Sequence, residues 1–417
     1  MHSKLMTNQM KWVSALSTRP SLEAAIAEVV EQAQQRLQDP ADLAIVFVSS
    51  AFASEFSRLM PLLQERLAVT ALIGCSGGGI VGVDPAAQVQ EVEGVAALSL
   101  TLAKLPGVKV QAFHVSGNQL PDLDSPPDRW VELIQADPQD NPQFILLADP
   151  FSASINNLLQ GLDYAYPDAV KIGGLASAGA ISPHSGLFCN FETFSEGIVG
   201  IALSGDVVLE AIVAQGCRPI GQPYRVVEGE RNILMQLEEQ VDADTIACGP
   251  SQTPLDVLQS LFQDLNEADR VLAQHSLFVG IASNEFKQRL DQGDFLVRNL
   301  LGVDPKTGAI AVGDRIRPGQ RIQFHLRDAE TSTEDLELLL ARHHRTSSTE
   351  AVGALMFSCL GRGEGLYGQP NYDSRLFDRY FAGVPVSGFF CNGEIGPVGN
   401  TTFLHGYTSV FGILRQP

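Results

Sequence analysis

A short unit recurs three times along the chain: an apolar strand, a helix, a second apolar strand and a glycine-rich turn. The three units end at residues 70–79, 170–179 and 384–394, where strand-forming residues run into glycine and small polar residues. Backbone N–H groups in such a turn can face a ligand because no side chain lies in the way. We therefore interpret the three turns as the walls of a binding site.

The spacing within the unit indicates an internal duplication. Gly74 follows Ser49, the end of the first strand of its unit, by 25 positions, and Gly173 follows Ala148 by the same 25. The third copy spans 30 positions and contains a glycine-rich insertion at 361–368. Equal spacing predicts repeated structure, although strand–helix–strand units also recur by chance in α/β proteins.

These units predict an α/β fold (mixed α+β) with two layered domains, whose mixed sheets are built from the repeated unit. A chain of 417 residues is too long for one ordinary core. Residues 216–224 contain turn residues and two prolines, so we place the junction there, between domains at 1–215 and 216–417. Residues 207–214 are expected to form the last strand of the second repeat, and residues 232–239 a short helix.

The charge balance excludes some partners. The chain has 28 lysines and arginines against 48 aspartates and glutamates, a formal charge of −20. Nucleic acid and anionic membrane surfaces attract basic proteins, so neither is expected as the main partner. The N-terminus lacks the apolar run of a signal peptide, and no uncharged apolar stretch reaches the length of a membrane span, so membrane insertion is not expected.

The cysteines indicate a reducing compartment. The six cysteines are widely spaced and form no C-x-x-C motif, which favours reduced thiols over a disulfide framework or a zinc site. We therefore expect a cytoplasmic protein that holds no metal, and no cofactor is predicted.

The candidate ligand-binding residues lie in the turns and at the strand ends beside them: Cys75, Ser76, Gly77, Asp149, Ser152, Gly174, Ser177, Arg362, Cys391, Asn392 and Glu394. The N–H groups of residues 76–79 can hold a carboxylate or a phosphate, and the alternative is a tight hairpin turn. The chain lacks a P-loop and a G-x-G-x-x-G motif, so a nucleotide is not expected.

Three charged candidates have specific roles. Asp149 follows a strand end, where ligands gather in α/β sheets, and it can bind an ammonium group that Ser152 orients. Alternatively, Asp149 caps the next helix. Arg362 lies among glycines and can clamp a carboxylate with two parallel hydrogen bonds, or it is a solvated loop arginine. Glu394 follows a buried strand and needs a partner, either the ligand or Arg362.

Six short segments occur in an order that resembles one known family: residues 72–76, 172–177, 216–221, 295–303, 355–363 and 388–396. This is the FIST family, named for F-box and intracellular signal transduction proteins. The resemblance extends over both the N-terminal and the C-terminal FIST regions, nearly the whole chain. It implies a sensory module for small ligands such as amino acids in bacterial signalling. In contrast to many relatives, no part of the chain is left for a kinase, cyclase or F-box domain.

We therefore expect a stand-alone, non-enzymatic signalling protein that binds an amino acid or a small carboxylate and acts on a downstream protein partner. No catalytic residue is assigned. One alternative is a thiol enzyme with Cys75 or Cys391 as nucleophile and His184 or His405 as base, which requires the base within hydrogen-bond reach. Both histidines are otherwise expected to be structural. Another alternative is a protein-docking module without a ligand.

Overall fold

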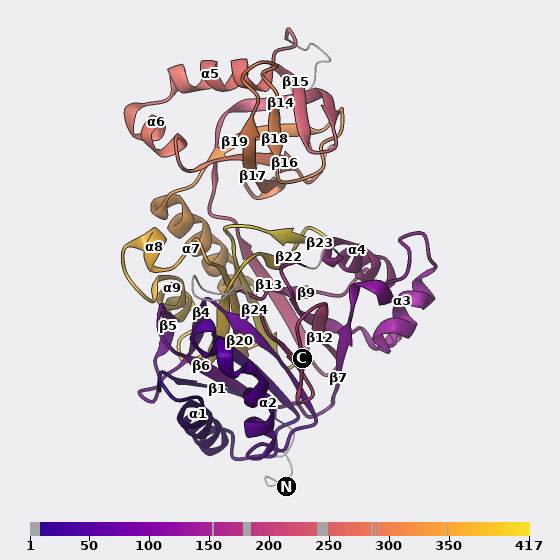
Figure 1. Cartoon of the computed structure of the whole chain (residues 1–417), viewed down its shortest axis with the longest axis vertical. Coiled ribbons are helices and arrows are strands. Elements are labelled where there is room, and N and C mark those ends of the chain that lie inside the picture. Colours follow the sequence, from indigo (N-terminus) through magenta and orange to yellow (C-terminus); the bar gives the residue numbers. More distant parts are fainter. Residues whose placement is uncertain are drawn as a thin grey trace. The chain divides into compact units, whose positions relative to one another are not determined.

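A computed structural model describes residues 9–151, 154–177, 185–239, 249–284, 287, 289–290, 292–347 and 349–417. The chain forms two compact units, one of Met1–Ala214 with Glu337–Pro417 and one of Gln215–Leu336. Both units contain helices and strands, and the sheets of the first unit mix parallel and antiparallel pairs (Figure 1). The predicted mixed fold with repeated strand–helix–strand units is confirmed.

The first unit is made of three repeats with the same order of elements. The first repeat contains β1 (Lys11–Ser17), α1 (Leu22–Leu37), β2 (Leu43–Ser49), the 3₁₀ helix η1 (Ser50–Glu55), α2 (Phe56–Gln64), β3 (Ala71–Gly77), β4 (Gly79–Val83), β5 (Val89–Glu93) and β6 (Leu98–Lys104). The second contains β7 (Val108–Val115), η2 (Gly117–Gln119), α3 (Pro127–Ile134), η3 (Pro138–Asp140), β8 (Gln143–Ala148), α4 (Ile155–Ala165), β9 (Lys171–Leu175), β10 (Leu187–Cys189), β11 (Glu192–Phe194) and β12 (Ile198–Gly205).

The third repeat is interrupted by the second unit. It contains β13 (Val208–Ala214) and then α7 (Ala329–Thr346), β20 (Ala351–Cys359), α8 (Glu364–Tyr367), α9 (Tyr372–Tyr380), β21 (Val386–Cys391), β22 (Glu394–Val398), β23 (Thr401–His405) and β24 (Ser409–Arg415). In the first two repeats a short connection joins the first strand to the next helix. The second unit is therefore an insertion at this connection of the third repeat.

The three sheets of the first unit have equivalent strand orders. They are β1-β6-β2-β3-β10-β11, β7-β12-β8-β9-β22-β23 and β13-β24-β20-β21-β4-β5. In each sheet the two strands of the predicted unit lie parallel at the centre, and the last strand of the repeat runs antiparallel beside them. The far edge is a hairpin from another repeat. The three sheets are therefore completed by a cyclic exchange of hairpins.

These pairings explain why the compact units differ from the contiguous halves 1–215 and 216–417 expected from the sequence. Residues 337–417 belong with the N-terminal part because β24 pairs with β13 and β21 pairs with β4. The strand expected at 207–214 forms as β13, but it is the edge of the third sheet and not part of the second repeat's sheet.

One core lies between the inner faces of the three sheets. Alternate residues of the central strands point into it, such as Phe47 of β2 and Phe357 of β20, and the intervening residues point to the outer faces. The rings of Phe47 and Phe389 stack with their centroids 5.1 Å apart. Helices cover the outer faces: α1 and α2 on the first sheet, α3 and α4 on the second, and α9 on the third (Figure 1). Burial of both faces explains the continuous apolar runs of these strands.

A glycine is required at one equivalent position in each repeat. Gly74, Gly173 and Gly388 each face the preceding strand of their own parallel pair. A Cβ atom would lie 2.2 Å from the carbonyl oxygen of Val46 at the first position, and 1.8 Å from the facing carbonyl oxygen at the other two. These distances are far below van der Waals contact, so each glycine permits a close approach of two backbones.

The exchanged hairpin of β4 and β5 is held against α9 by a buried carboxyl group. Glu91 is 5% exposed, and its Oε1 accepts the N–H of Ser374 (2.6 Å). The N–H of Glu91 donates to Oδ1 of Asn371 (2.6 Å). Burial and the nearby negative charge of Asp373 raise the pKa of Glu91 to about 7. The docked hairpin therefore favours a protonated carboxyl group.

The second unit is a closed barrel with the strand order β14-β15-β18-β17-β16-β19. Its elements are β14 (Arg218–Glu230), β15 (Ile233–Glu239), α5 (Pro254–Asp264), α6 (Glu267–Ala273), β16 (Leu277–Ala282), η4 (Gln292–Asp294), β17 (Phe295–Val303), β18 (Ile310–Val312) and β19 (Arg321–Leu326). The helix expected at 232–239 is wrong, because these residues pair with β14 and β18 as a strand. No helix among the described residues of the chain is long and apolar enough to cross a membrane.

We expect Gly388→Ala to destabilise the protein by on the order of 3 kcal/mol, because the new Cβ would collide with backbone that cannot move without breaking the sheet. Urea unfolding measures this difference. Gly365→Ala is the matched control, since a Cβ at Gly365 meets no atom within 4 Å. Equal stability of the two variants would contradict the assigned close approach.

We expect the free energy of unfolding to fall as the pH rises from about 4.5 to about 7, partly because of Glu91. In this window the unfolded chain is ionised at this position while the folded protein retains the proton. The contribution of the group is about 3 kcal/mol. Glu91→Gln should therefore flatten the pH profile and stabilise the protein at pH values above this window. The exposed Glu65→Gln serves as control, and identical slopes in all three proteins would refute the assignment.

Candidate functional site

The carboxyl ends of the three central strands are equivalent positions. The register of the three parallel strand pairs makes Ser49, Asp149 and Cys359 equivalent to one another. Each donates its backbone N–H to the carbonyl of the residue before the last strand of its repeat, at 2.8, 2.9 and 3.0 Å respectively. Ligands in α/β sheets bind outside such strand ends. The equivalence shows that Asp149 has counterparts in the other two repeats.

The three glycine-rich turns meet at two buried serines. Oγ of Ser76 donates to the carbonyl of Ser177 (3.2 Å) and accepts the N–H of Gly186 (3.0 Å). Oγ of Ser177 accepts the N–H of Gly78 (2.8 Å) and donates to the carbonyl of Phe390. The hydroxyl of Ser177, which lies in the turn of the second repeat, thus contacts the turns of both the first and the third repeats. Both serines, predicted as ligand contacts, hold the turns together in the structure.

The small residues of the turns serve the same packing. A Cβ at Gly174 would lie 2.4 Å from Sγ of Cys391, and one at Gly77 would lie 2.8 Å from Cβ of Phe389. Cys75 and Cys391 are fully buried. The glycines therefore make room for a neighbouring turn. The sequence had instead predicted that they make room for a ligand.

We call the surface at the carboxyl ends of the three central strands the rim. Its polar groups come from the second and third repeats. Asp149 is 6% exposed, and its Oδ1 accepts the hydroxyl of Ser185 (2.9 Å), the neighbour of the residue that Ser76 binds. The side chain of Asn392 is exposed, and its backbone N–H donates to the carbonyl of Leu175 (3.1 Å). Leu175 pairs in the sheet with the residue before Asp149. Asp149 and Asn392 therefore flank the same pair of strand ends. Ser152 and His184 lie outside the described residues.

Phe151 lies two residues after Asp149 and is 78% exposed. Sequence reasoning missed this residue, because an isolated phenylalanine outside a strand or helix has no periodicity that marks it. An aromatic ring can bind a cationic group through its face, so Phe151 is a candidate contact because it lies close to Asp149 in the sequence.

Arg362 forms the expected two parallel hydrogen bonds, but with a carboxylate of the chain itself. The side chain is fully buried, and its Nε and Nη2 donate to the two carboxylate oxygens of Asp373 (2.8 and 3.0 Å). Nη2 also donates to the hydroxyl of Tyr367 (2.5 Å), which donates in turn to Asp373 (2.8 Å). The expectation of a ligand-clamping or solvated arginine is therefore corrected: Arg362 holds the glycine-rich loop to α9.

Glu394 and His405 contact the backbone of the third repeat. Oε2 of the fully buried Glu394 accepts the N–H of Thr408 (3.1 Å), the residue whose carbonyl accepts the N–H of Cys359. Nε2 of His405 lies 3.0 Å from the carbonyl oxygen of Gly396. Glu394 thus braces the strand end that is equivalent to Asp149, and this contact is with backbone, whereas the sequence suggested the ligand or Arg362 as its partner.

The two thiols proposed as nucleophiles are not activated. Burial raises the pKa of the Cys75 thiol well above its ordinary value. Burial, with the nearby charge of Glu394, does the same for Cys391. A nucleophilic cysteine needs the opposite shift, because the thiolate is the reactive form. Cys359 is partly exposed and occupies the position equivalent to Asp149. An alignment of the three repeats would have revealed that Cys359 is equivalent to Asp149, whereas spacing along the chain does not.

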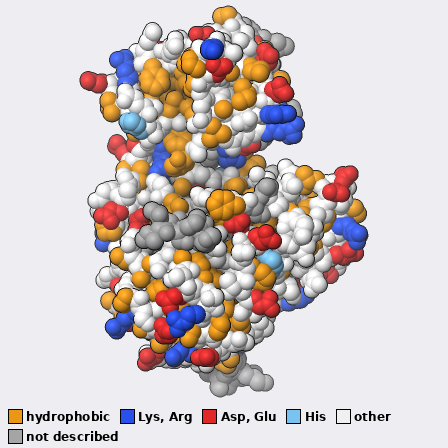
Figure 2. All heavy atoms as spheres, viewed as in Figure 1, with side chains coloured by type: hydrophobic (Ala, Val, Ile, Leu, Met, Phe, Trp, Pro, Cys, Tyr) orange, Lys and Arg blue, Asp and Glu red, His pale blue; other side chains and the backbone are white. Residues whose placement is uncertain are grey.

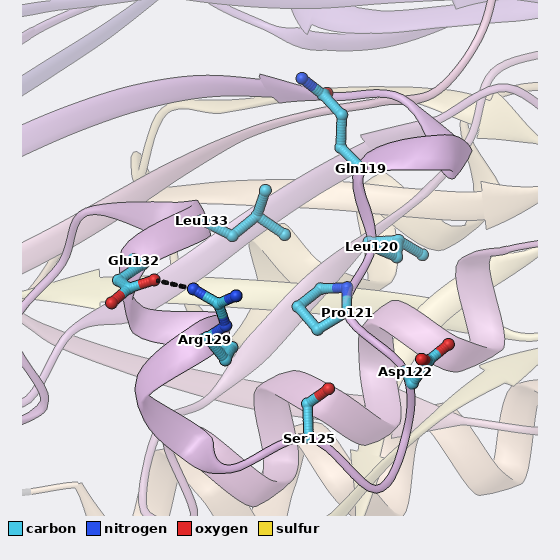
Figure 3. Close-up of a pocket in the computed structure, with 8 residues that line it drawn as sticks. All are labelled: Gln119, Leu120, Pro121, Asp122, Ser125, Arg129, Glu132 and Leu133. Carbon is cyan, nitrogen blue, oxygen red and sulfur yellow. Dashed lines mark hydrogen bonds and ion pairs between the residues drawn. The ribbon is translucent and has the colours of Figure 1, made fainter.

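A surface hollow of about 490 Å³ lies between η2 and α3 (Figure 3). Arg129 and Glu132 on its wall form an ion pair (2.9 Å). Both side chains are largely exposed, so the pair contributes little free energy. None of the lining residues comes from the three turns. The hollow lacks the buried polar groups that mark the strand-end site.

We expect Cys75 and Cys391 to react with iodoacetamide ~10-fold or more slowly than Cys359 near neutral pH, because burial excludes the reagent and disfavours the thiolate. A short labelling pulse followed by peptide mass spectrometry measures each site separately. Protein denatured in urea is the control, in which all three should react at similar rates. Fast labelling of Cys75 or Cys391 in the native protein would restore the thiol-enzyme alternative.

Comparison with known proteins gives two family matches along the chain. The model of the FIST N domain matches residues 42–240, and the model of the FIST C domain matches residues 254–397. The matched segments thus include the three turns and most of the barrel.

Similar proteins occur in bacteria and in a plant. The uncharacterized protein Rv0628c of Mycobacterium tuberculosis is 32% identical over 396 residues, which are 94% of this chain and 97% of that protein. The uncharacterized protein Mb0898c of Mycobacterium bovis is 30% identical over 393 residues, 94% of this chain and 95% of its own. The F-box/LRR-repeat protein At5g63520 of Arabidopsis thaliana is 24% identical over 460 residues, 96% of this chain and 85% of its own. The chain belongs to the FIST family, whose domains are signal-transduction domains.

Proposed function

We propose that the protein is a sensory protein in which a small molecule binds at the carboxyl ends of the three central strands. The observation that carries this proposal is the convergence of the three turns at Ser76 and Ser177, with the buried carboxylate of Asp149 at the rim. A carboxylate with few exposed atoms favours a cationic partner over water. Membership of a family of signal-transduction domains supports a sensory role over catalysis.

The ligand class is an amino acid or a similar small zwitterion. Its ammonium group binds Asp149 and the face of Phe151, two residues away. Its carboxylate binds Asn392 and backbone N–H groups of the rim. Arg362 does not bind the carboxylate, because two of its nitrogens already bind Asp373.

The other candidate residues lie in the protein interior and support this site. Cys75, Ser76, Gly77, Gly174, Ser177, Cys391 and Glu394 are buried and join the three turns. They fix the relative positions of the strand ends, and they transmit a change at the rim to all three sheets. Ser152, at the start of the segment beside Asp149, remains a proposed ligand contact.

The downstream partner is another protein, in keeping with a signalling role in the cytoplasm. The net charge of −20 disfavours nucleic acid. Figure 2 shows acidic side chains interspersed with basic ones over the face drawn. Mixed surfaces of this kind suit soluble protein partners.

Calorimetry with a panel of amino acids and small organic acids tests the proposal. For any amino acid that binds the wild type, we expect Asp149→Asn to weaken the affinity by ~10–100-fold, because it removes a charge-assisted hydrogen bond. Asparagine keeps the oxygen that accepts from Ser185, so the fold should be retained. Asp122→Asn, in the hollow between η2 and α3, is the control with the same change of charge.

Two results would count against the proposal. Equal affinity of Asp149→Asn and wild type would show that the ligand binds elsewhere. Absence of binding across the panel would favour the docking role without a ligand.

A further inference from the structure

A second, smaller cavity lies on α9, and none of the strand-end residues Ser49, Asp149 and Cys359 lines it. It has a volume of about 110 Å³ and is lined by Gln369, Tyr372, Arg375, Leu376 and Arg379. This volume holds about four water molecules at ~30 Å³ each. It is therefore the size of a single small ionic group, below the size of sites for larger organic ligands.

The cavity has an unusual charge. Arg375 and Arg379 lie four residues apart on α9, on the same face of the helix. Two like charges at this spacing destabilise a helix slightly, and a bound anion would offset their repulsion. Within the described parts of the chain, neither guanidinium has a hydrogen-bond or ion-pair partner. This is notable in a chain with 48 acidic and 28 basic residues, where carboxylates are abundant.

The wall of the cavity is held rigidly from behind. The ring of Tyr372 stacks on Tyr367, with centroids 4.0 Å apart and planes 14° apart. Tyr367 is fixed by Arg362 and Asp373. Leu376 is 2% exposed and anchors the helix to the core. The two arginines therefore project from a fixed face, which lowers the entropy lost when they bind.

Two acidic side chains of this region, those of Asp378 and Glu337, bind other groups. Oδ1 of Asp378 accepts the N–H of Gly383 (3.2 Å), and Glu337 accepts the hydroxyl of Tyr380 (3.2 Å). Burial and the hydrogen bond to Glu337 raise the pKa of Tyr380, and the nearby charges of Arg379 and Arg345 oppose this shift. A third arginine thus adds to the positive potential near α9.

We propose that this cavity binds a small oxyanion, a phosphate group or a carboxylate, between Arg375 and Arg379. Arginine forks match the oxygens of both groups with paired hydrogen bonds. The amide of Gln369 is a further donor on the same wall. This site is separate from the proposed amino-acid site and does not depend on it.

Inorganic phosphate and acetate are the probes, titrated separately into the full chain at constant ionic strength. Calorimetry and ³¹P line broadening report phosphate binding, and calorimetry reports acetate. We expect weak saturable binding by the wild type, and a loss of ~10-fold or more in affinity for Arg375→Gln with Arg379→Gln. The corresponding lysine variants keep the charges without the fork and should retain part of the affinity.

Arg66→Gln with Arg317→Gln is the matched control, because it removes the same two charges from other exposed positions. All substituted side chains are exposed on the surface, so thermal unfolding of the variants without the probes should occur at temperatures no lower than that of the wild type. Preference for phosphate or for acetate assigns the oxyanion. Unchanged binding in the double glutamine variant, or no saturable binding of either probe by the wild type, would overturn the proposal.

Discussion

Each of the three sheets is completed by a hairpin from a different repeat, and the first unit depends on this exchange. A polar side chain holds each hairpin to its host. Asn190 accepts the N–H of Leu72 (3.1 Å), and Asp163 accepts the N–H and hydroxyl of Thr402 (2.7 and 2.8 Å). Glu91 performs the same task for the third hairpin. No repeat can satisfy its sheet edge alone, so the three are expected to unfold together.

The exchange also explains which parts of the fold the sequence could predict. Apolar runs and glycine spacing revealed the strand–helix–strand units, because burial on both faces and close backbone approach leave marks at each position. They did not reveal pairing partners. Residues 207–214 follow the second repeat in sequence but pair in the third sheet, and 232–239 carry apolar spacing compatible with either helix or strand. The hydrophobic pattern of a strand indicates how deeply the strand is buried. Tertiary contacts, which the pattern does not contain, determine which strand pairs with it.

The site shows the same limit at the level of side chains. The glycines and serines of the turns were found, and the structure brings them together, yet their contacts are with one another. Likewise the guanidinium of Arg362 has the predicted fork but an internal carboxylate, Asp373, eleven residues on. Residue type predicts which bonds a group can make. Whether the partner is a ligand or the chain depends on distances that spacing along the sequence does not contain.

Differences among the repeats, more than their likeness, indicate where function lies. Of the three equivalent strand ends, Ser49, Asp149 and Cys359, the second brings a negative charge to the rim. The third repeat has the inserted barrel and the buried ion pair of Arg362 and Asp373. A repeated fold needs the shared glycines and hairpin anchors in every copy, so these residues are explained by stability alone. A charge that occurs in one copy is not required by the fold that the repeats share, and its burial costs free energy unless a partner such as that of Arg362 compensates it. Under the proposed function, Asp149 at the rim binds a cationic group of the ligand in addition to the hydroxyl of Ser185.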